Sequence, residues 1–157
     1  MKRAGTRRAG RELAVQCLFH FDHNSTPPES ALPWVLDFTG DQGKPLAGSP
    51  EIRAFGEKLA LDVWQHRPEI DERIAQATAN FRVERIGGVE RAILRLAIHE
   101  MLHCLEVPPV VAINEAIEIA KKYAAEDSLK FVNGVLDRIR KDLPRDPRTG
   151  APLAPSA

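Results

Sequence analysis

The residues whose types and spacing could do chemistry begin with His99-Glu100-Met101-Leu102-His103, a literal His-Glu-x-x-His motif. On a helix this spacing puts two imidazoles on one face, and the glutamate could act as general base toward a zinc-bound water. A zinc enzyme also needs a third protein ligand and an open cleft. The motif therefore gives one alternative function, a zinc-dependent hydrolase that uses His99, Glu100 and His103.

The rest of the chain gives this motif little support. Three other histidines show no spacing that completes a zinc site: His20, His23 and His66. Glu118 and Glu126 lie at suitable downstream distances, but each fits a solvated helix face. The simpler interpretation is a polar row at steps of four that faces water or a partner. This row consists of Arg91, Arg95, His99 and His103.

Other common catalytic patterns do not occur. The sequence has no glycine-rich phosphate loop, no Cys-x-x-Cys pair and no Ser, His and Asp spacing for a nucleophile. The two cysteines, Cys17 and Cys104, lie on predicted apolar faces and are expected to be reduced. We therefore expect no catalytic residues, no metal and no cofactor.

A second kind of chemistry is suggested by the distribution of charge. The net charge is zero, yet a basic group precedes the first acidic residue, Glu12: Lys2, Arg3, Arg7, Arg8 and Arg11. Phe19 shares a helical face with Arg8 away from the expected core, and Phe131 flanks an apolar stripe beside Lys130. Packing at the edge of the core would explain both rings. The sharper hypothesis is a surface for single-stranded nucleic acid, with cations on phosphates and rings stacked on bases.

Helices must position these residues, because apolar residues recur at steps of three and four. Segment 111–143 holds two such stripes around Glu126-Asp127-Ser128, where a short polar side chain could cap the second helix. Gly134 interrupts that helix, and close approach of a neighbouring helix is its simplest reason. A loop is expected over 39–50. Further helices are expected over 6–22, 28–38, 50–67, 68–80 and 88–105, the last buried on most of its circumference.

Composition bounds the rest of the interpretation. A length of 157 residues, 43% hydrophobic and 28% charged, is typical of one globular domain. The helical stripes predict an all-α fold, with one helical domain of about seven helices over 1–143. The proline-rich tail, 144–157, is expected to be disordered. No apolar run approaches the ~20 residues that span a bilayer. No signal-peptide core is present, so a cytoplasmic protein is expected.

Three segments together resemble the NusB transcription antitermination family. They are AINEAIEIAKKYAAEDSLKFVNGVLDRI from Ala112, RVERIGGVERAILRLAIHE from Arg82, and RAGRELAVQCL from Arg8. They touch about two-thirds of the chain, and the first is highly specific. The family usually has an aromatic residue where this chain has His99, which makes the His-Glu-x-x-His match a coincidence.

The resemblance implies two packed three-helix units and no catalysis. Members bind boxA-type single-stranded RNA of ribosomal RNA leaders together with ribosomal protein NusE, in an antitermination complex on RNA polymerase. Asp127 could accept a hydrogen bond from a base amine as well as cap its helix. Acidic faces with Glu115 and Glu118 would suit a basic partner, and a homodimer that hides the RNA surface is an alternative. The implied RNA-binding residues are Arg7, Arg8, Arg11, Gln16, Phe19, Glu126, Asp127, Lys130 and Phe131.

Overall fold

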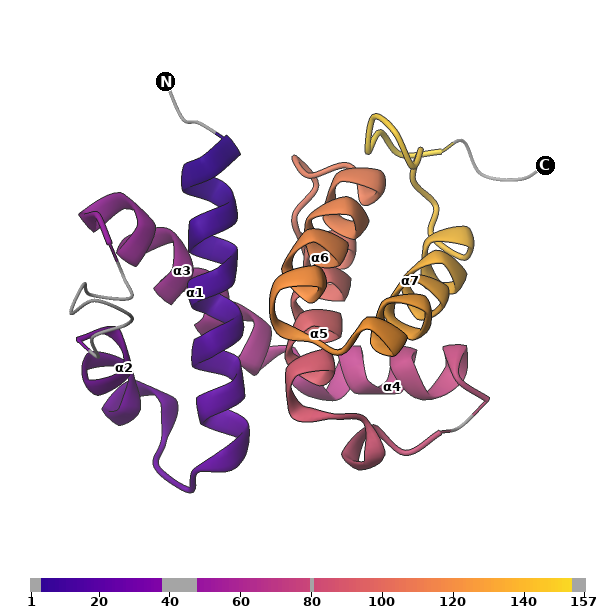
Figure 1. Ribbon diagram of the computed structural model, residues 1–157. Coiled ribbons are helices and arrows are strands. Elements are labelled where there is room, and N and C mark those ends of the chain that lie inside the picture. The colour runs from indigo at the N-terminus through magenta and orange to yellow at the C-terminus, as the bar shows by residue number, and fades with distance from the viewer. Residues whose placement is uncertain (1–3, 38–47, 80, 154–157) are drawn as a thin grey trace. The chain divides into compact units, whose positions relative to one another are not determined.

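The protein is described by a computed structural model that covers residues 4–37, 48–79 and 81–153 (Figure 1). These residues form seven α-helices and one 3₁₀ helix, with a single isolated β-bridge. The all-α prediction is confirmed. The chain divides into two compact units, 1–65 and 66–157. None of the described helices is long and apolar enough to cross a membrane.

The first unit contains α1 (Ala4–His23), α2 (Pro28–Leu36) and α3 (Pro50–Gln65). Helix α1 packs mainly against α3 and also contacts α2 (Figure 1). Gly56 makes the α1–α3 approach close, since an added Cβ would lie 2.9 Å from the Gly10 carbonyl oxygen. Ser49 caps α3, as its sequence position predicts, because its Oγ accepts a hydrogen bond from the Ile52 amide at 3.3 Å.

Helix α2 is shorter than expected and tolerates an internal proline. It was predicted to reach Phe38, but it ends at Leu36, and Phe38 lies outside the described residues together with most of the expected loop. Pro33 lies inside the helix and does not end it, since the Asp37 amide donates to the Pro33 carbonyl oxygen at 3.1 Å. The buried face of α2 carries Leu32, Val35 and Leu36.

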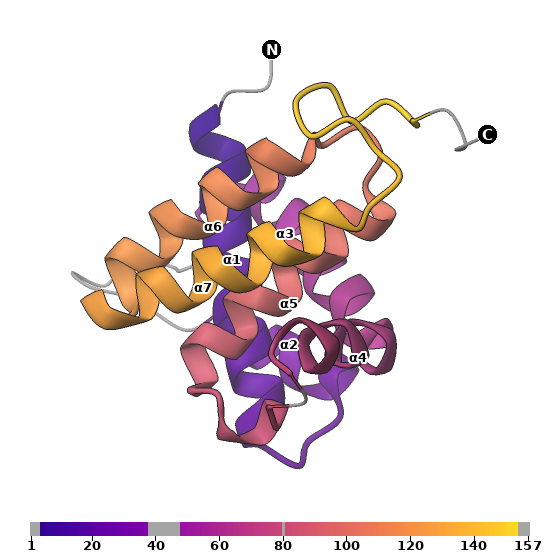
Figure 2. The same cartoon turned by 90° about the vertical axis from the view of Figure 1, so that its right-hand side faces the viewer.

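The second unit contains four α-helices rather than the expected three. They are α4 (Arg67–Ala77), α5 (Gly88–His103), α6 (Pro109–Tyr123) and α7 (Glu126–Lys141), with the 3₁₀ helix η2 (Val83–Arg85) before α5. Helix α5 contacts α4, α6 and α7, and every residue from Ala92 to Met101 is buried. The prediction of a central, nearly encircled helix is confirmed. Figure 2 shows α6 and α7 lying side by side against α5.

Two local predictions about α7 are wrong. Its N-cap residue is Ala125, with no side-chain cap, and Asp127 and Ser128 lie inside the first turn. The Ser128 hydroxyl instead donates to Glu90 Oε1 at 2.8 Å, so it bonds to α5 and not to its own helix end. Gly134 is exposed, and no heavy atom lies within 4 Å of an added Cβ. Helix packing therefore does not require this glycine.

The tail differs most from its expected disorder. Over 144–153 it folds back in a turn with an antiparallel bridge between Arg145 and Pro152, while 154–157 lie outside the described residues. Arg145 is only 7% exposed, and its guanidinium donates to the carbonyl oxygens of Met101, Leu105 and Val107 at 2.7–3.0 Å. A cation just beyond α5 meets the Met101 carbonyl of the last helical turn and the carbonyls of Leu105 and Val107 in the segment that follows, and composition alone does not reveal this.

The turn also reaches the start of α6. The Val110 amide donates to the Pro147 carbonyl at 2.8 Å. Within the turn, the amides of Arg148 and Thr149 donate to Asp146 Oδ1, and these bonds hold the pKa of Asp146 below its usual value. Gly150 closes the turn with φ +78°, a conformation that favours glycine.

Candidate nucleic-acid interface

The first part of the predicted surface lies on α1. Arg7 and Arg8 are exposed, and the Arg7 guanidinium carbon lies 4.8 Å from the centre of the Phe55 ring. Arg8 and Phe19 are eleven residues apart, which places them on nearly the same side of the helix, about 16 Å apart along its axis. A cation and a ring in line along one helix face can contact the phosphates and bases of one strand.

Phe19 is exposed, as the helical angle predicts. Its exposed fraction is 39%, and its ring stacks on the His23 imidazole with centroids 4.1 Å apart and planes inclined by 23°. The His23 Nδ1 atom is 2.8 Å from the Phe19 carbonyl oxygen, to which Nδ1–H donates. This bond holds the imidazole against the ring and extends the aromatic surface.

Two other residues of α1 lie differently from their expected places. Arg11 is 5% exposed, so the structure does not present it as a surface cation, and Gln16 is half-buried. Val15, expected on the outer face, is also buried. The covered arc of α1 is therefore wider than the apolar stripe in its sequence. A hydrophobic pattern marks the centre of a buried face but not its edges.

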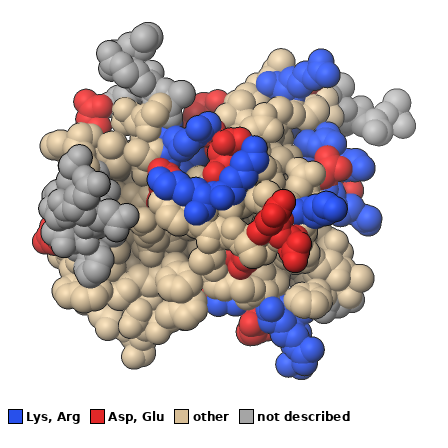
Figure 3. Space-filling view, viewed as in Figure 1, with Lys and Arg blue, Asp and Glu red and all other residues tan. Residues whose placement is uncertain are grey.

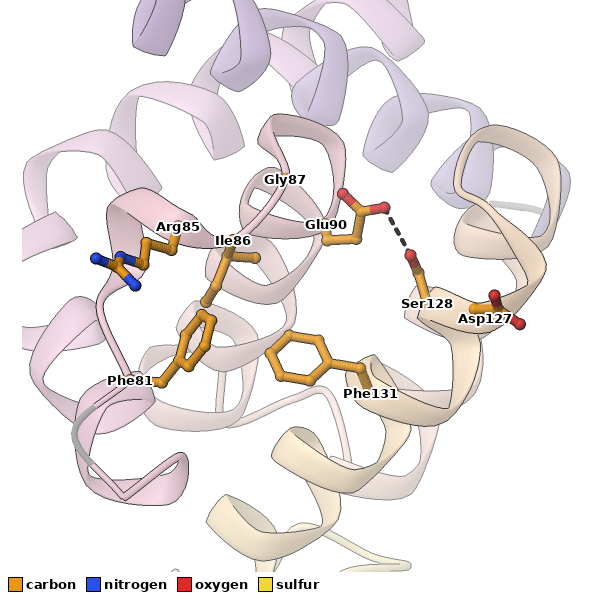
Figure 4. A pocket seen from close by; sticks show the side chains of 8 residues that line it. All are labelled: Phe81, Arg85, Ile86, Gly87, Glu90, Asp127, Ser128 and Phe131. Atoms are coloured by element: carbon orange, nitrogen blue, oxygen red, sulfur yellow. Dashed lines mark hydrogen bonds between the residues drawn. The ribbon is translucent and has the colours of Figure 1, made fainter.

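The second part of the predicted surface lies at the start of α7. Glu126, Asp127, Lys130 and Phe131 are all exposed. The Phe131 ring faces Phe81 from the loop after α4, with centroids 6.5 Å apart and planes inclined by 60° (Figure 4). Both rings are large, exposed apolar groups, Phe81 at 45% and Phe131 at 37%. Two such rings provide faces for unpaired bases.

A hollow of about 340 Å³ lies beside this pair of rings. Figure 4 shows Ile86 next to Phe81, with Arg85 at one edge and Asp127 at the other. A second hollow reaches the other side of the rings and includes Lys130. This arrangement suits a nucleotide. The apolar ring faces stack on its base, the cations contact its phosphate, and the carboxylate accepts a hydrogen bond from a base amine. The first hollow is lined by Phe81, Arg85, Ile86, Gly87, Glu90, Asp127, Ser128 and Phe131.

Hydrogen bonds inside the second unit hold this hollow in shape. The bond from Ser128 to Glu90 joins the first turns of α7 and α5 (Figure 4). Arg91 donates to the carbonyl oxygens of Val83 and Ile86 at 3.2 and 2.8 Å, which fixes the 3₁₀ helix η2 that carries Arg85. The sequence prediction missed Phe81 and Arg85, because neither belongs to a helical stripe.

The polar row of α5, expected to face water or a partner, does so only in part: His103 is exposed, whereas Arg95 and His99 are buried. Arg95 donates to both carboxylate oxygens of Asp71 on α4, at 2.9 and 2.8 Å, and His99 is 3% exposed. Glu100, the general base that the hydrolase alternative requires, is 2% exposed inside the core. A buried carboxylate cannot activate a water in an open cleft, so the zinc hydrolase is not supported.

The acidic residues proposed for a partner lie on α6. Glu118 is exposed and forms an ion pair with Lys121, with 3.1 Å between Glu118 Oε1 and Lys121 Nζ. Glu115 is half-buried. Figure 3 shows acidic and basic side chains interspersed on the face that it displays. An exposed pair of this kind contributes little stability, so its groups can exchange for those of a partner.

Comparison with known proteins gives one consistent family. The model of the NusB family matches residues 8–141. A transcription antitermination protein NusB from Symbiobacterium thermophilum is 42% identical over 135 residues, which cover 85% of this chain and 88% of that protein. The NusB of Geobacter sulfurreducens is 42% identical over 140 residues, covering 89% of this chain and 97% of that protein.

Solved structures agree with the sequence relatives. NusB of T. maritima superposes with a TM-score of 0.74 at 33% identity, covering 90% of this chain and 94% of that chain. A crystal structure of the antitermination factors NusB and NusE in complex with double-stranded RNA matches with a TM-score of 0.74 at 26% identity. It covers 90% of this chain and 100% of that chain.

Proposed function

This chain belongs to the NusB family, and from that premise we propose that it is a transcription antitermination factor that binds boxA-type single-stranded RNA of ribosomal RNA leaders. The observation that carries the RNA surface is the exposure of Phe19 and Phe131, the two rings assigned to it from the sequence. A ring kept out of the core beside cations favours stacking on bases.

The proposed RNA surface has two parts. The part on α1 uses Arg7, Arg8 and Phe19, with the half-buried Gln16 at its edge. The part on α7 uses Glu126, Asp127, Lys130 and Phe131, to which we add Phe81 and Arg85. Arg11 stays in the proposal only as a support for its neighbours on α1, since its side chain is buried.

Ribosomal protein NusE is the proposed protein partner, within an antitermination complex on RNA polymerase. A solved relative is a complex of NusB and NusE with RNA, which supports this assignment. We propose that the protein acts in the cytoplasm, where transcription takes place, and performs no catalysis. Its work is binding, and the residues named above are binding residues.

The test compares the salt dependence of RNA binding in two variants. Arg8→Ala removes one phosphate contact, so affinity falls and the slope of log K against log salt flattens by about 0.7. Phe19→Ala removes stacking, so affinity falls by about 1–3 kcal/mol with little change in slope. Titrations of boxA-like and scrambled RNA by fluorescence anisotropy, with and without NusE, measure both quantities.

Matched controls come from exposed residues outside the proposed surface. Arg148→Ala and Trp34→Ala remove an exposed cation and an exposed ring, and both should bind RNA like the parent protein. Equal salt slopes for Arg8→Ala and Phe19→Ala would contradict the assignment of their roles. Equal affinity for boxA-like and scrambled RNA in the presence of NusE would contradict the proposed function.

A further inference from the structure

The second unit gathers three histidines that are far apart in sequence. His66 immediately precedes α4, while His99 and His103 lie one turn apart near the end of α5. One ring nitrogen of each residue lies within 4.8 Å of those of the other two. His66 and His103 stack with centroids 4.2 Å apart, and His99 lies 5.2 Å from both. Sequence spacing offered no third ligand, because His66 meets the α5 pair only through the packing of α4 on α5.

These distances are close to those of a metal site. Zinc binds imidazole nitrogen at about 2.0–2.1 Å, which puts ligand nitrogens about 3.4 Å apart in a tetrahedron. Rotation of the half-buried His66 ring and the exposed His103 ring would shorten separations of up to 4.8 Å to this value. Three imidazoles are the ligands that Zn²⁺, Ni²⁺ and Cu²⁺ bind readily, and a water can complete the shell.

Glu69 adds the carboxylate that commonly orients a ligand histidine. Its Oε1 atom lies 2.7 Å from His103 Nε2, and both side chains are partly exposed. A carboxylate only accepts hydrogen bonds, so Nε2 carries the proton and Nδ1 of a neutral His103 keeps its lone pair for a metal. Carboxylate–histidine pairs of this kind fix the ring and raise its basicity as a ligand.

We propose that His66, His99 and His103 bind one divalent transition-metal ion, with Zn²⁺ the best match, and that Glu69 orients His103. The site lies at the packed ends of α4 and α5 and uses none of the residues assigned to RNA. Its role is to join α4 to α5, since a metal that binds only the folded state stabilises it. The site is non-catalytic, because Glu100 lies inside the core.

Equilibrium dialysis of the full chain against Zn²⁺ tests the proposal, with Co²⁺ as a spectroscopic probe. The parent protein should bind one equivalent, and its melting temperature should rise with Zn²⁺ concentration. His66→Ala and His103→Ala should each lower the affinity by more than 100-fold, and Glu69→Gln by about 10–100-fold. Affinity should fall as the pH is lowered, because protons compete for the same nitrogens.

The controls separate loss of a ligand from loss of the fold. His20→Ala removes a histidine of the first unit and should leave Zn²⁺ binding unchanged, and the metal-free variants should keep the parent's circular dichroism. His99 is not substituted, since its side chain is buried. Absence of stoichiometric binding, or binding that His66→Ala and His103→Ala leave unchanged, would overturn the proposal.

Discussion

At the scale of single residues, exposed aromatic rings distinguish the proposed RNA surface from the core. Phe21 belongs to the apolar stripe of α1 that faces the core, and it is buried. Phe19, two positions earlier, lies on another side of the helix and is exposed. Helical angle alone predicted that difference. Phe81 could not be found in this way, because it lies in a loop where no periodicity separates inside from outside. Its only sequence signal is a large ring just after a helix end.

Cys17 gives a prediction about alkaline pH. Burial, and secondarily the nearby Glu57 carboxylate, raise the pKa of this thiol from 9.0 to about 12. The folded state therefore favours the protonated thiol. The stability that this provides is complete below pH 9 and declines from there to about pH 12 as the unfolded chain ionises. The decline is at most about 1.4 kcal/mol per pH unit.

Urea unfolding between pH 8 and 10.5 measures this decline. Cys17→Ala should be less stable at pH 8 but should lose less stability as the pH rises. Val132→Ala is the control, because it removes buried apolar atoms of α7 and no titratable group, so it should lower stability and leave the slope of the parent protein. Parallel stability profiles for Cys17→Ala and the parent protein would refute the assignment.

At the scale of helices, sequence periodicity predicted which segments are helical and which helix is central. The predicted start of α5 at Gly88 and the predicted start of α3 at Pro50 agree with the structure. Two predictions failed where groups at a helix end form hydrogen bonds with residues that are far away in the sequence. Ser128 bonds to Glu90 across 38 positions, and Arg145 bonds to Met101 across 44. Local sequence does not record such partners.

Gly134 offers a gain in the stability of α7. It lies in the helix interior, and an added Cβ meets nothing within 4 Å. Gly134→Ala should therefore raise the free energy of unfolding by about 1 kcal/mol, through helix propensity and a less flexible unfolded chain. Gly56→Ala is the opposite control and should destabilise, since its Cβ would crowd the Gly10 carbonyl and Leu13. Urea unfolding of both variants decides this, and destabilisation by Gly134→Ala would show a close packing role after all.

Arg145 gives a prediction about the junction of α5 and α6. Its guanidinium donates to three carbonyls near the end of α5 and to the Gly150 carbonyl at 3.0 Å. Arg145→Ala leaves these buried acceptors without a donor and should lower the free energy of unfolding by about 3 kcal/mol. The exposed Arg148 provides the control, since Arg148→Ala should change stability by less than about 0.5 kcal/mol. Equal unfolding midpoints for the two variants would show that the turn adds nothing.

At the scale of the whole molecule, each of the two compact units carries its own part of the proposed RNA surface. Phe19 in the first unit and Phe131 in the second should each stack on an unpaired base. Phe19→Ala and Phe131→Ala should therefore each lower the affinity for boxA-like RNA by about 1–3 kcal/mol. Fluorescence anisotropy titrations of the two variants measure this loss. An affinity that either variant leaves unchanged would remove that ring from the proposed surface.

The folded-back turn over 144–153 affects the order in which native contacts form during translation. The carbonyl groups of Met101, Leu105 and Val107 emerge from the ribosome some forty positions before the arginine that satisfies them. Until that arginine has emerged, these three carbonyl oxygens lack their guanidinium donor. The last native contacts of the second unit thus form late in synthesis, and a stalled nascent chain should lack the protease resistance of the finished molecule.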